Sequence, residues 1–163
     1  MALRDFFIAY RQTALLPGEV LTCIKIPRVP EGLRRVFRVW KVSKRIDQDI
    51  SAVCGAFALE LSSDGVIVRA GVAFGGMAAV PKRASNCEAA LAGQLWNTAT
   101  ARAAADALML DFKPLSDMRA TRNYRIQVSK NLLLRFHLET GIDRGSFPVR
   151  LPASALTDAG AAS

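Results

Sequence analysis

The sequence predicts an α+β domain, with an antiparallel sheet of about three strands and three helices packed on one face. Two observations lead to this fold class. Hydrophobic residues alternate with a period of two up to about Phe74, and they recur with a period of about 3.6 after it. The strands therefore precede the helices, an order typical of α+β folds.

Residues 5–28 predict two extended segments separated by the turn signal Pro17-Gly18. Pro27 and Pro30 then bracket a short linker. We therefore expect residues 1–30 to be a leading fragment and residues 31–150 to be the main domain. The remaining residues, 151–163, are small and polar, and we expect a disordered tail.

Three strands are predicted in the main domain, over residues 35–42, 50–61 and 66–74. In the second strand, large apolar residues occupy one face and small residues the other, where we expect a helix to approach closely. The large residues are Val53, Phe57, Leu59 and Leu61, and the small ones are Ala52, Cys54, Ala56 and Ala58. Asp64-Gly65 predicts a type I′ hairpin into the third strand, which ends at Gly75-Gly76.

Three helices follow. Residues 83–93 predict a short helix stopped by Gly93, and residues 98–110 a strong helix former. The second helix carries one apolar face, formed by Ala101, Ala104, Ala105, Leu108 and Met109. Residues 116–140 predict a long helix with Ser116 as N-cap and Gly141 at its end. Its expected apolar stripe is Ala120, Tyr124, Val128, Leu132 and Phe136, and its cations are expected on a solvated side.

Composition excludes some classes of function but does not identify one. The net charge is +8 with a pI near 10.0, which suits nucleic acid, an acidic membrane surface or a phosphate-bearing ligand. Three cysteines without a C-x-x-C motif predict small core residues, and a single histidine excludes a His-rich metal site. No apolar run approaches the roughly 18–20 residues of a membrane span, and no signal peptide is evident, so we expect a cytoplasmic protein.

A dense charge cluster, "KVSKRIDQD", runs from Lys41 to Asp49 just before the second strand. A solvated loop accounts for such a pattern. The alternative is a loop that faces an anionic cofactor, because lysine donors suit phosphates or developing negative charge. The pattern alone leaves both interpretations open.

Four segments resemble, in order and spacing, the flavin-binding part of the xanthine dehydrogenase family, nearest to its bacterial small subunit. They are "FFIAYRQTALLPGEVLTCIKIP", "WKVSKRIDQDISAVCGAFAL", "VAFGGMAAVPKRA" and "PLSDMRATRNYRIQVSKNLLLRF". Carbon monoxide dehydrogenase flavoproteins and related molybdenum hydroxylases carry similar segments. The resemblance covers roughly residues 4–140, so the chain looks like the C-terminal portion of the FAD-binding subunit.

The resemblance implies a place in an electron-transfer chain. In such enzymes a molybdopterin-bearing large subunit oxidises hypoxanthine or xanthine, iron–sulfur clusters carry the electrons to FAD, and reduced FAD passes hydride to NAD. The glycine-rich loops that hold the FAD pyrophosphate in this family have no counterpart here. The expected partners are therefore the N-terminal half of the FAD subunit, the large subunit and NAD, and FAD binding is expected of the complete subunit only.

The resemblance also implies site residues. Leu21 and Lys41 match FAD-contacting positions, and Val42–Ala52, with Asp49 and Ile50, match a loop beside the isoalloxazine ring. Arg11 keeps part of a "YRKT"-like motif in which Gln12 replaces the lysine. Gln48 and Ile46 stand where animal enzymes carry an acid and an arginine, which argues against animal-type dehydrogenase/oxidase switching. None of these residues is expected to be an acid or base catalyst, and no metal ligand is expected.

Two other functions stay open from sequence. One is a basic nucleic-acid-binding module, although aromatic residues make up only 7% and no nucleic-acid motif is recognisable. The other is a stand-alone, non-catalytic interaction domain that homo-associates through the side that would face the flavin.

Overall fold

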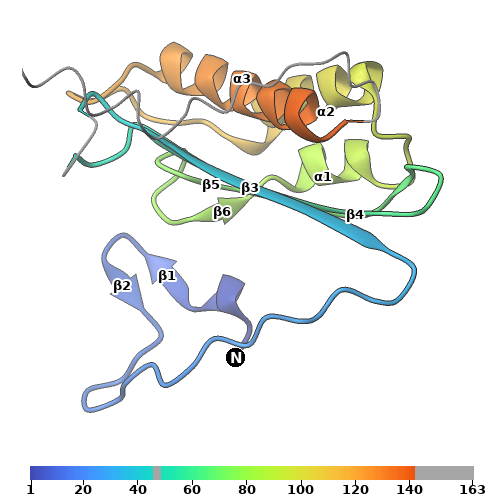
Figure 1. Cartoon of the computed structure of the whole chain (residues 1–163). Helices are drawn as coiled ribbons and strands as arrows, with labels where there is room; N and C mark the ends of the chain where they lie inside the picture. Colours follow the sequence, from blue (N-terminus) through green and yellow to red (C-terminus); the bar gives the residue numbers. More distant parts are fainter. Residues whose placement is uncertain (46–48, 142–163) are drawn as a thin grey trace, which may run out of the picture.

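The main sheet has four antiparallel strands in the order β3-β4-β5-β6, covered by three helices on one side (Figure 1). This computed structural model describes residues 1–45 and 49–141. In chain order the elements are η1 (Leu3–Asp5), β1 (Phe7–Ala9), β2 (Gln12–Thr13), β3 (Arg34–Val42), β4 (Val53–Leu61), β5 (Ile67–Gly75), β6 (Lys82–Arg83), α1 (Ser85–Leu91), α2 (Thr98–Asp111) and α3 (Arg122–Thr140). The α+β class is confirmed.

The number of strands differs from the prediction. β6 adds a fourth strand through only two residue pairs with β5, and β1 and β2 form a separate two-stranded sheet. Two-residue strands are too short to show an alternation of apolar residues, so sequence periodicity cannot reveal them. β3 has a partner on one side only and is an edge of the main sheet.

The core lies on the large-residue face of β4. Val53, Phe57, Leu59 and Leu61 are fully buried beneath the helices. The expectation that a helix would approach the small-residue face is wrong, because burying large side chains removes more apolar area from water. The opposite, open face of the sheet carries Cys54, Ala56 and Ala58 of β4, and the leading segment, residues 1–33, lies on that side (Figure 1).

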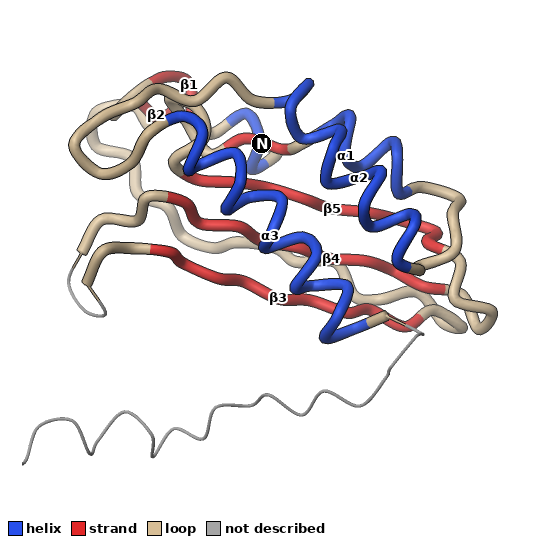
Figure 2. Tube along the Cα trace, turned by 90° about the horizontal axis from the view of Figure 1, so that it is seen from above, coloured by secondary structure: helices blue, strands red, loops and turns tan. Residues whose placement is uncertain are grey.

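Figure 2 shows α3 crossing β3 and β4 while α1 lies beside β5. Asn97 caps α2 by accepting a hydrogen bond from the Thr100 amide at 3.0 Å. The buried face of α2 holds Ala101, Ala104, Ala105 and Leu108, as expected, but Met109 is 57% exposed.

α3 begins later than predicted, and its buried stripe differs. Thr121, not Ser116, is the N-cap, because the Asp117 carboxylate accepts from the Arg119 and Ala120 amides and forms a turn there instead. Tyr124 is exposed. The residues of α3 that are buried are Arg125, Ser129, Leu132, Leu133, Phe136, His137 and Thr140.

The β4–β5 hairpin is confirmed with a different turn. Gly65 alone has a positive φ, +79°, and the amide of Ser62 donates to the Val66 carbonyl at 3.0 Å. A type I′ turn needs two positive φ angles, whereas a three-residue loop that ends in a left-handed glycine needs one. None of the helices in the described part of the chain is long and apolar enough to cross a membrane.

Candidate functional site

Lys41 lies near the end of β3 on the open face of the sheet. It pairs in register with Cys54, which in turn pairs with Gly75, so small residues flank it across the sheet. Lys41 is exposed, and its ammonium makes no hydrogen bond or ion pair with any other residue that the structure describes. This cation is therefore free to meet an anionic group.

The 42–52 loop, described for residues 42–45 and 49–52, follows directly. Its base is closed by the Ala52 amide, which donates to the Val42 carbonyl at 2.8 Å. Inside it, the Arg45 amide donates to the Asp49 carboxylate at 3.1 Å, so Asp49 orders the loop backbone. Ile50 is 63% exposed, so the loop presents an apolar side chain to a partner.

Arg125 of α3 meets the loop from inside the protein. It is only 3% exposed, and its guanidinium donates to the carbonyls of Ala52 and Gly76 and to the Asp117 carboxylate. The Gly76 bond is 2.8 Å and the Asp117 bond is 2.6 Å. Pattern analysis missed Arg125 because it assigned the helix cations to a solvated side. The available signal was an arginine four residues before Ser129, in line with Leu132 and Phe136 on the apolar side of the helix.

Asp117 is held in its ionised form. Hydrogen bonds from the backbone amides of Ala120 and Arg119, followed by the Arg125 guanidinium, lower the pKa of Asp117 to about 2. The carboxylate therefore carries a full negative charge beside the buried arginine at neutral pH.

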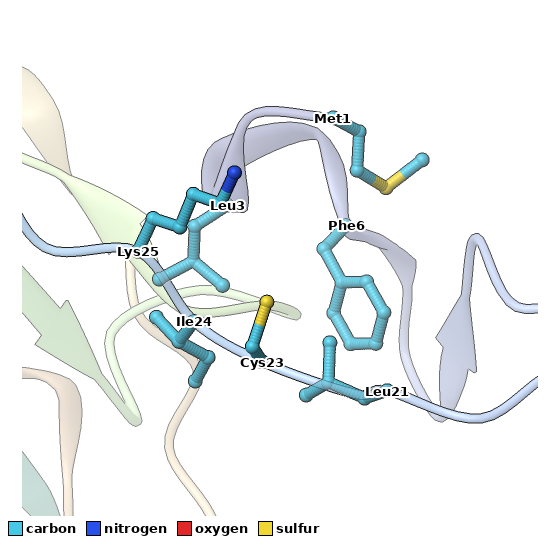
Figure 3. Close-up of a pocket in the computed structure, with 7 residues that line it drawn as sticks. All are labelled: Met1, Leu3, Phe6, Leu21, Cys23, Ile24 and Lys25. Carbon is cyan, nitrogen blue, oxygen red and sulfur yellow. The ribbon is translucent and has the colours of Figure 1, made fainter.

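Leu21 belongs to the leading segment, whereas Lys41 belongs to β3. Leu21 lines a pocket of about 310 Å³, in which Figure 3 shows apolar side chains gathered around Cys23 with Lys25 at one side. The lining residues are Met1, Leu3, Phe6, Leu21, Cys23, Ile24 and Lys25.

Arg11 sits at the turn between β1 and β2 with a φ of +59°, and its guanidinium lies 5.4 Å from the Tyr10 ring centroid. A left-handed backbone at a residue other than glycine is uncommon and recurs at functional positions. Within the described ranges, no hydrogen bond or ion pair joins Leu21 or Arg11 to Lys41, Asp49 or Ile50. The expected site residues thus come from two parts of the chain, the leading segment and the end of β3 with its loop, and Ile46 and Gln48 lie outside the described residues.

The three cysteines differ in their surroundings. Cys87 is buried, and burial together with the nearby carboxylates of Asp111 and Glu88 raises the pKa of its thiol. Cys54 is half-buried and Cys23 is exposed, so the expectation of three core cysteines is wrong for Cys23. The leading segment does not fold compactly enough to bury the Cys23 side chain. Among residues 1–45 and 49–141, no three histidine, cysteine or acidic side chains gather as a metal site.

Comparison with known proteins assigns the family. The model of the CO dehydrogenase flavoprotein C-terminal domain matches residues 38–140, which include β3 from Arg38 onward, the 42–52 loop and all three helices. The chain belongs to the CO dehydrogenase flavoprotein C-terminal domain family. The resemblance seen in the sequence is therefore confirmed.

The relatives that this chain matches are larger oxidoreductases. Xanthine dehydrogenase of Emericella nidulans is 38% identical over 109 residues, and nicotinate hydroxylase of the same organism is 31% identical over 136 residues. These matches cover 66% and 81% of this chain but only 8% and 10% of the relatives.

Solved structures agree with the assignment. Carbon monoxide dehydrogenase from Hydrogenophaga pseudoflava matches with a TM-score of 0.71 at 25% identity, over 80% of this chain and 44% of that one. Quinoline 2-oxidoreductase from Pseudomonas putida 86 matches with a TM-score of 0.68 at 28% identity, over 83% of this chain and 46% of that one. The chain thus spans less than half of the solved chains and about a tenth of the curated relatives.

Proposed function

We propose that this chain is the C-terminal part of the flavin subunit of a xanthine dehydrogenase, where it helps to position FAD for electron transfer from iron–sulfur clusters to NAD. The observation that carries the proposal is the unpaired ammonium of Lys41, on the open sheet face at the head of the 42–52 loop. The family match over residues 38–140 supports this placement.

The residues fit one end of FAD. A free cation and an exposed apolar side chain, Lys41 and Ile50, suit a flat ring system that gains negative charge on reduction. FAD supplies the hydride and electron chemistry when bound, and the protein orients it. Lys41 would support that charge, Leu21 would pack on the cofactor, and the 42–52 loop with Asp49 would shape its surroundings. Arg11 would contribute a second cation from the leading segment.

The leading segment supports the proposed partner, the N-terminal half of the flavin subunit. Large hydrophobic side chains are exposed along it, and a monomeric surface rarely leaves so many together. They are Met1, Leu3, Phe7, Ile8, Tyr10, Leu15, Leu16, Val20, Leu21, Ile24, Ile26 and Val29. We propose that residues 1–30 complete a domain whose glycine-rich loops hold the FAD phosphates. The molybdopterin-binding large subunit and NAD complete the proposed set of partners, in a cytoplasmic setting that the free thiols support.

This division of the cofactor site can be tested by reconstitution. The isolated 163-residue chain should bind FAD weakly or not at all, whereas the chain joined to the N-terminal half should retain flavin through gel filtration. Flavin absorbance that co-elutes tightly with the isolated chain would contradict the proposal.

Replacing Lys41 tests the site directly. Lys41→Ala in the complete subunit should lower the flavin-to-protein ratio, because the cofactor loses its compensating charge. Arg38→Ala is the matched control, since this cation on the same strand pairs with Glu139 of α3 at 3.2 Å instead. Equal flavin occupancy in both variants would remove the role of Lys41.

The nucleic-acid alternative is less well supported. Several basic side chains of the described residues are paired with carboxylates and are therefore less available to a phosphate backbone. These pairs are Arg35–Glu60, Arg38–Glu139, Arg83–Glu88, Arg125–Asp117, Lys130–Asp106 and Arg135–Glu139. Homo-association through the apolar leading segment is the other candidate, and a mass that rises with concentration in light scattering would favour it.

A further inference from the structure

We propose that Arg125 is a positioning residue for the 42–52 loop: its buried guanidinium holds the base of this loop in one conformation. The relevance of this clamp to FAD rests on the proposed function, but the clamp itself does not.

The guanidinium joins three segments that are distant in sequence. Its acceptors are the carbonyl of Ala52 just before β4, the carbonyl of Gly76 just after β5, and the carboxylate of Asp117 before α3. A buried cation is costly unless it is compensated, and because the buried Nε has no hydrogen-bond partner, the compensation comes from the Nη1 and Nη2 bonds. These acceptors must therefore stay in place as long as the arginine is buried. A planar group with five donors in fixed directions imposes one geometry on them.

Ala52 connects this clamp to the loop. Its carbonyl accepts from Arg125, while its amide donates to the Val42 carbonyl at 2.8 Å and closes the loop base. Lys41 and Val42 form the last pairs of β3 with β4, so the base of the loop adjoins the candidate cofactor residue. Fixing Ala52 therefore fixes both ends of the loop.

A second tie reaches the first arm of the loop. The Lys44 ammonium donates to the Met118 carbonyl at 2.9 Å. Met118 follows Asp117, whose carboxylate orders this turn by accepting from the Arg119 and Ala120 amides. The Asp117 turn thus contacts the loop on one arm through Lys44 and on the other through Arg125.

Gly76 leaves the space that the clamp requires. Its φ is +80°, and an added Cβ would lie 2.5 Å from the Ala52 oxygen and 3.3 Å from the Arg125 Nη1 atom. The close approach of the Gly76 and Ala52 carbonyls around one guanidinium excludes a side chain at this position.

Loop opening in the chain itself gives a test without any cofactor. Arg125→Met removes all three hydrogen bonds, and Arg125→Lys keeps the charge but not the fork. We expect trypsin to cleave at Lys44 and Arg45 about tenfold faster or more in Arg125→Met, and at an intermediate rate in Arg125→Lys, because native-state cleavage follows the open population. Amide hydrogen exchange at Ala52 should rise in the same order.

Leu133→Ala is the control for lost stability. It removes a fully buried side chain of the same helix, and because leucine has no side-chain donor or acceptor, no hydrogen bond at the loop base is lost. The two variants are compared at denaturant concentrations that give equal fractions of folded protein. Equal cleavage at Lys44 and Arg45 in both would overturn the positioning role, and selective cleavage in Arg125→Met would support it. Should Arg125→Met not fold, Gly76→Ala gives the same readout with the guanidinium retained.

A second measurement separates the clamp from the cofactor. In the complete flavin subunit, Arg125→Lys should change the visible absorbance and circular dichroism of bound flavin at equal occupancy. If the loop opens in Arg125→Lys while the flavin spectra stay unchanged, the clamp is supported and the proposed function is contradicted. An unchanged loop would contradict the clamp whatever the flavin shows.

Discussion

Asp111 is a buried carboxylate at the end of α2 that holds the start of another helix. Its oxygens accept from the Asn86 amide and side chain at 2.9 Å and from the Cys87 amide at 3.0 Å. α1 has no cap of its own, because Ala84 precedes it and offers no side-chain acceptor. One side chain therefore performs the capping of α1 across a tertiary contact.

Replacing Asp111 should be costly. Asp111→Ala leaves two backbone amides without their acceptor, and we expect the free energy of unfolding to fall by about 2 kcal/mol or more. Asp106→Ala, in which the lost carboxylate is largely exposed, should cost less than about 1 kcal/mol. Urea denaturation of both variants measures the difference, and equal losses would contradict this role of Asp111.

The Asp117 carboxylate predicts a dependence of stability on acid. Its pKa in the folded protein is about 2, below the ordinary value of 3.8, so the fold favours the charged form. The stabilisation is therefore present above about pH 4 and is lost as the pH falls toward about 2. The difference in unfolding midpoint between the wild type and Asp117→Asn should shrink over this range, and a constant difference would show that the charge does not matter.

At the scale of elements, the turn after β5 is the most constrained connection of the sheet. Gly76 and Gly93 both adopt left-handed backbones, but a Cβ at Gly76 would lie within 3 Å of a backbone oxygen, whereas a Cβ at Gly93 would have nothing within 4 Å. The left-handed backbone and the lack of space for a side chain therefore occur at the same residue, Gly76, in the turn that contacts the 42–52 loop.

Three alanine substitutions separate these effects. Gly76→Ala should lower the free energy of unfolding by at least about 2 kcal/mol, because it adds a clash to the cost of a left-handed alanine. Gly93→Ala, with nothing within 4 Å of the new Cβ, should cost about 1 kcal/mol. Gly71→Ala meets ordinary contacts at 3.8 Å and should change stability by less than about 1 kcal/mol. A loss at Gly76 no larger than that at Gly93 would refute the crowding.

Local signals explain which elements were predictable. Asp64-Gly65 and the alternation of β4 predicted the hairpin, and the alanine-rich run predicted α2, because both depend on residues close in sequence. β6 depends on pairing with β5, and the late start of α3 depends on the Asp117 turn, so neither has a periodic signature. The prediction that a helix covers the small-residue face of β4 was wrong. It favoured a close helix approach over the burial of large side chains, and the sequence does not show which helices pack on the strand.

The candidate site was predictable only in part, and for the same reason. Lys41, Leu21 and Arg11 came from family resemblance, since no local pattern distinguishes them from solvated side chains. Arg125 acts through acceptors 73 and 49 residues away in the chain, so its role emerges only from the folded structure.

At the scale of the whole molecule, the leading segment and the main domain are weakly joined. The Arg35 guanidinium donates to the Pro27 carbonyl at 3.1 Å, and it also pairs with the buried Glu60 of β4. Among the described residues, no other hydrogen bond, from backbone or side chain, links residues 1–33 to the sheet or helices. The main domain has its own core of 22 buried apolar residues, beginning at Val36 and ending at Phe136.

Removing residues 1–33 should therefore leave the main domain folded. We expect residues 34–163 to unfold cooperatively, with a free energy of unfolding within about 1 kcal/mol of the full chain. Fluorescence of the dye ANS should fall, because the exposed apolar side chains of the leading segment are gone. Loss of cooperative unfolding would show that the leading segment is part of the core.

The position of β3 has a consequence for self-association. Nine residues of this strand have a bare backbone edge, which is a template for a further strand. Four cations, Arg34, Arg35, Arg38 and Lys41, lie along it. A second copy pairing there would bring like charges together, and the cost would be greatest at low salt. At Lys41, where we propose that the cation meets FAD, the positive charge would therefore also oppose strand pairing between two copies of this chain.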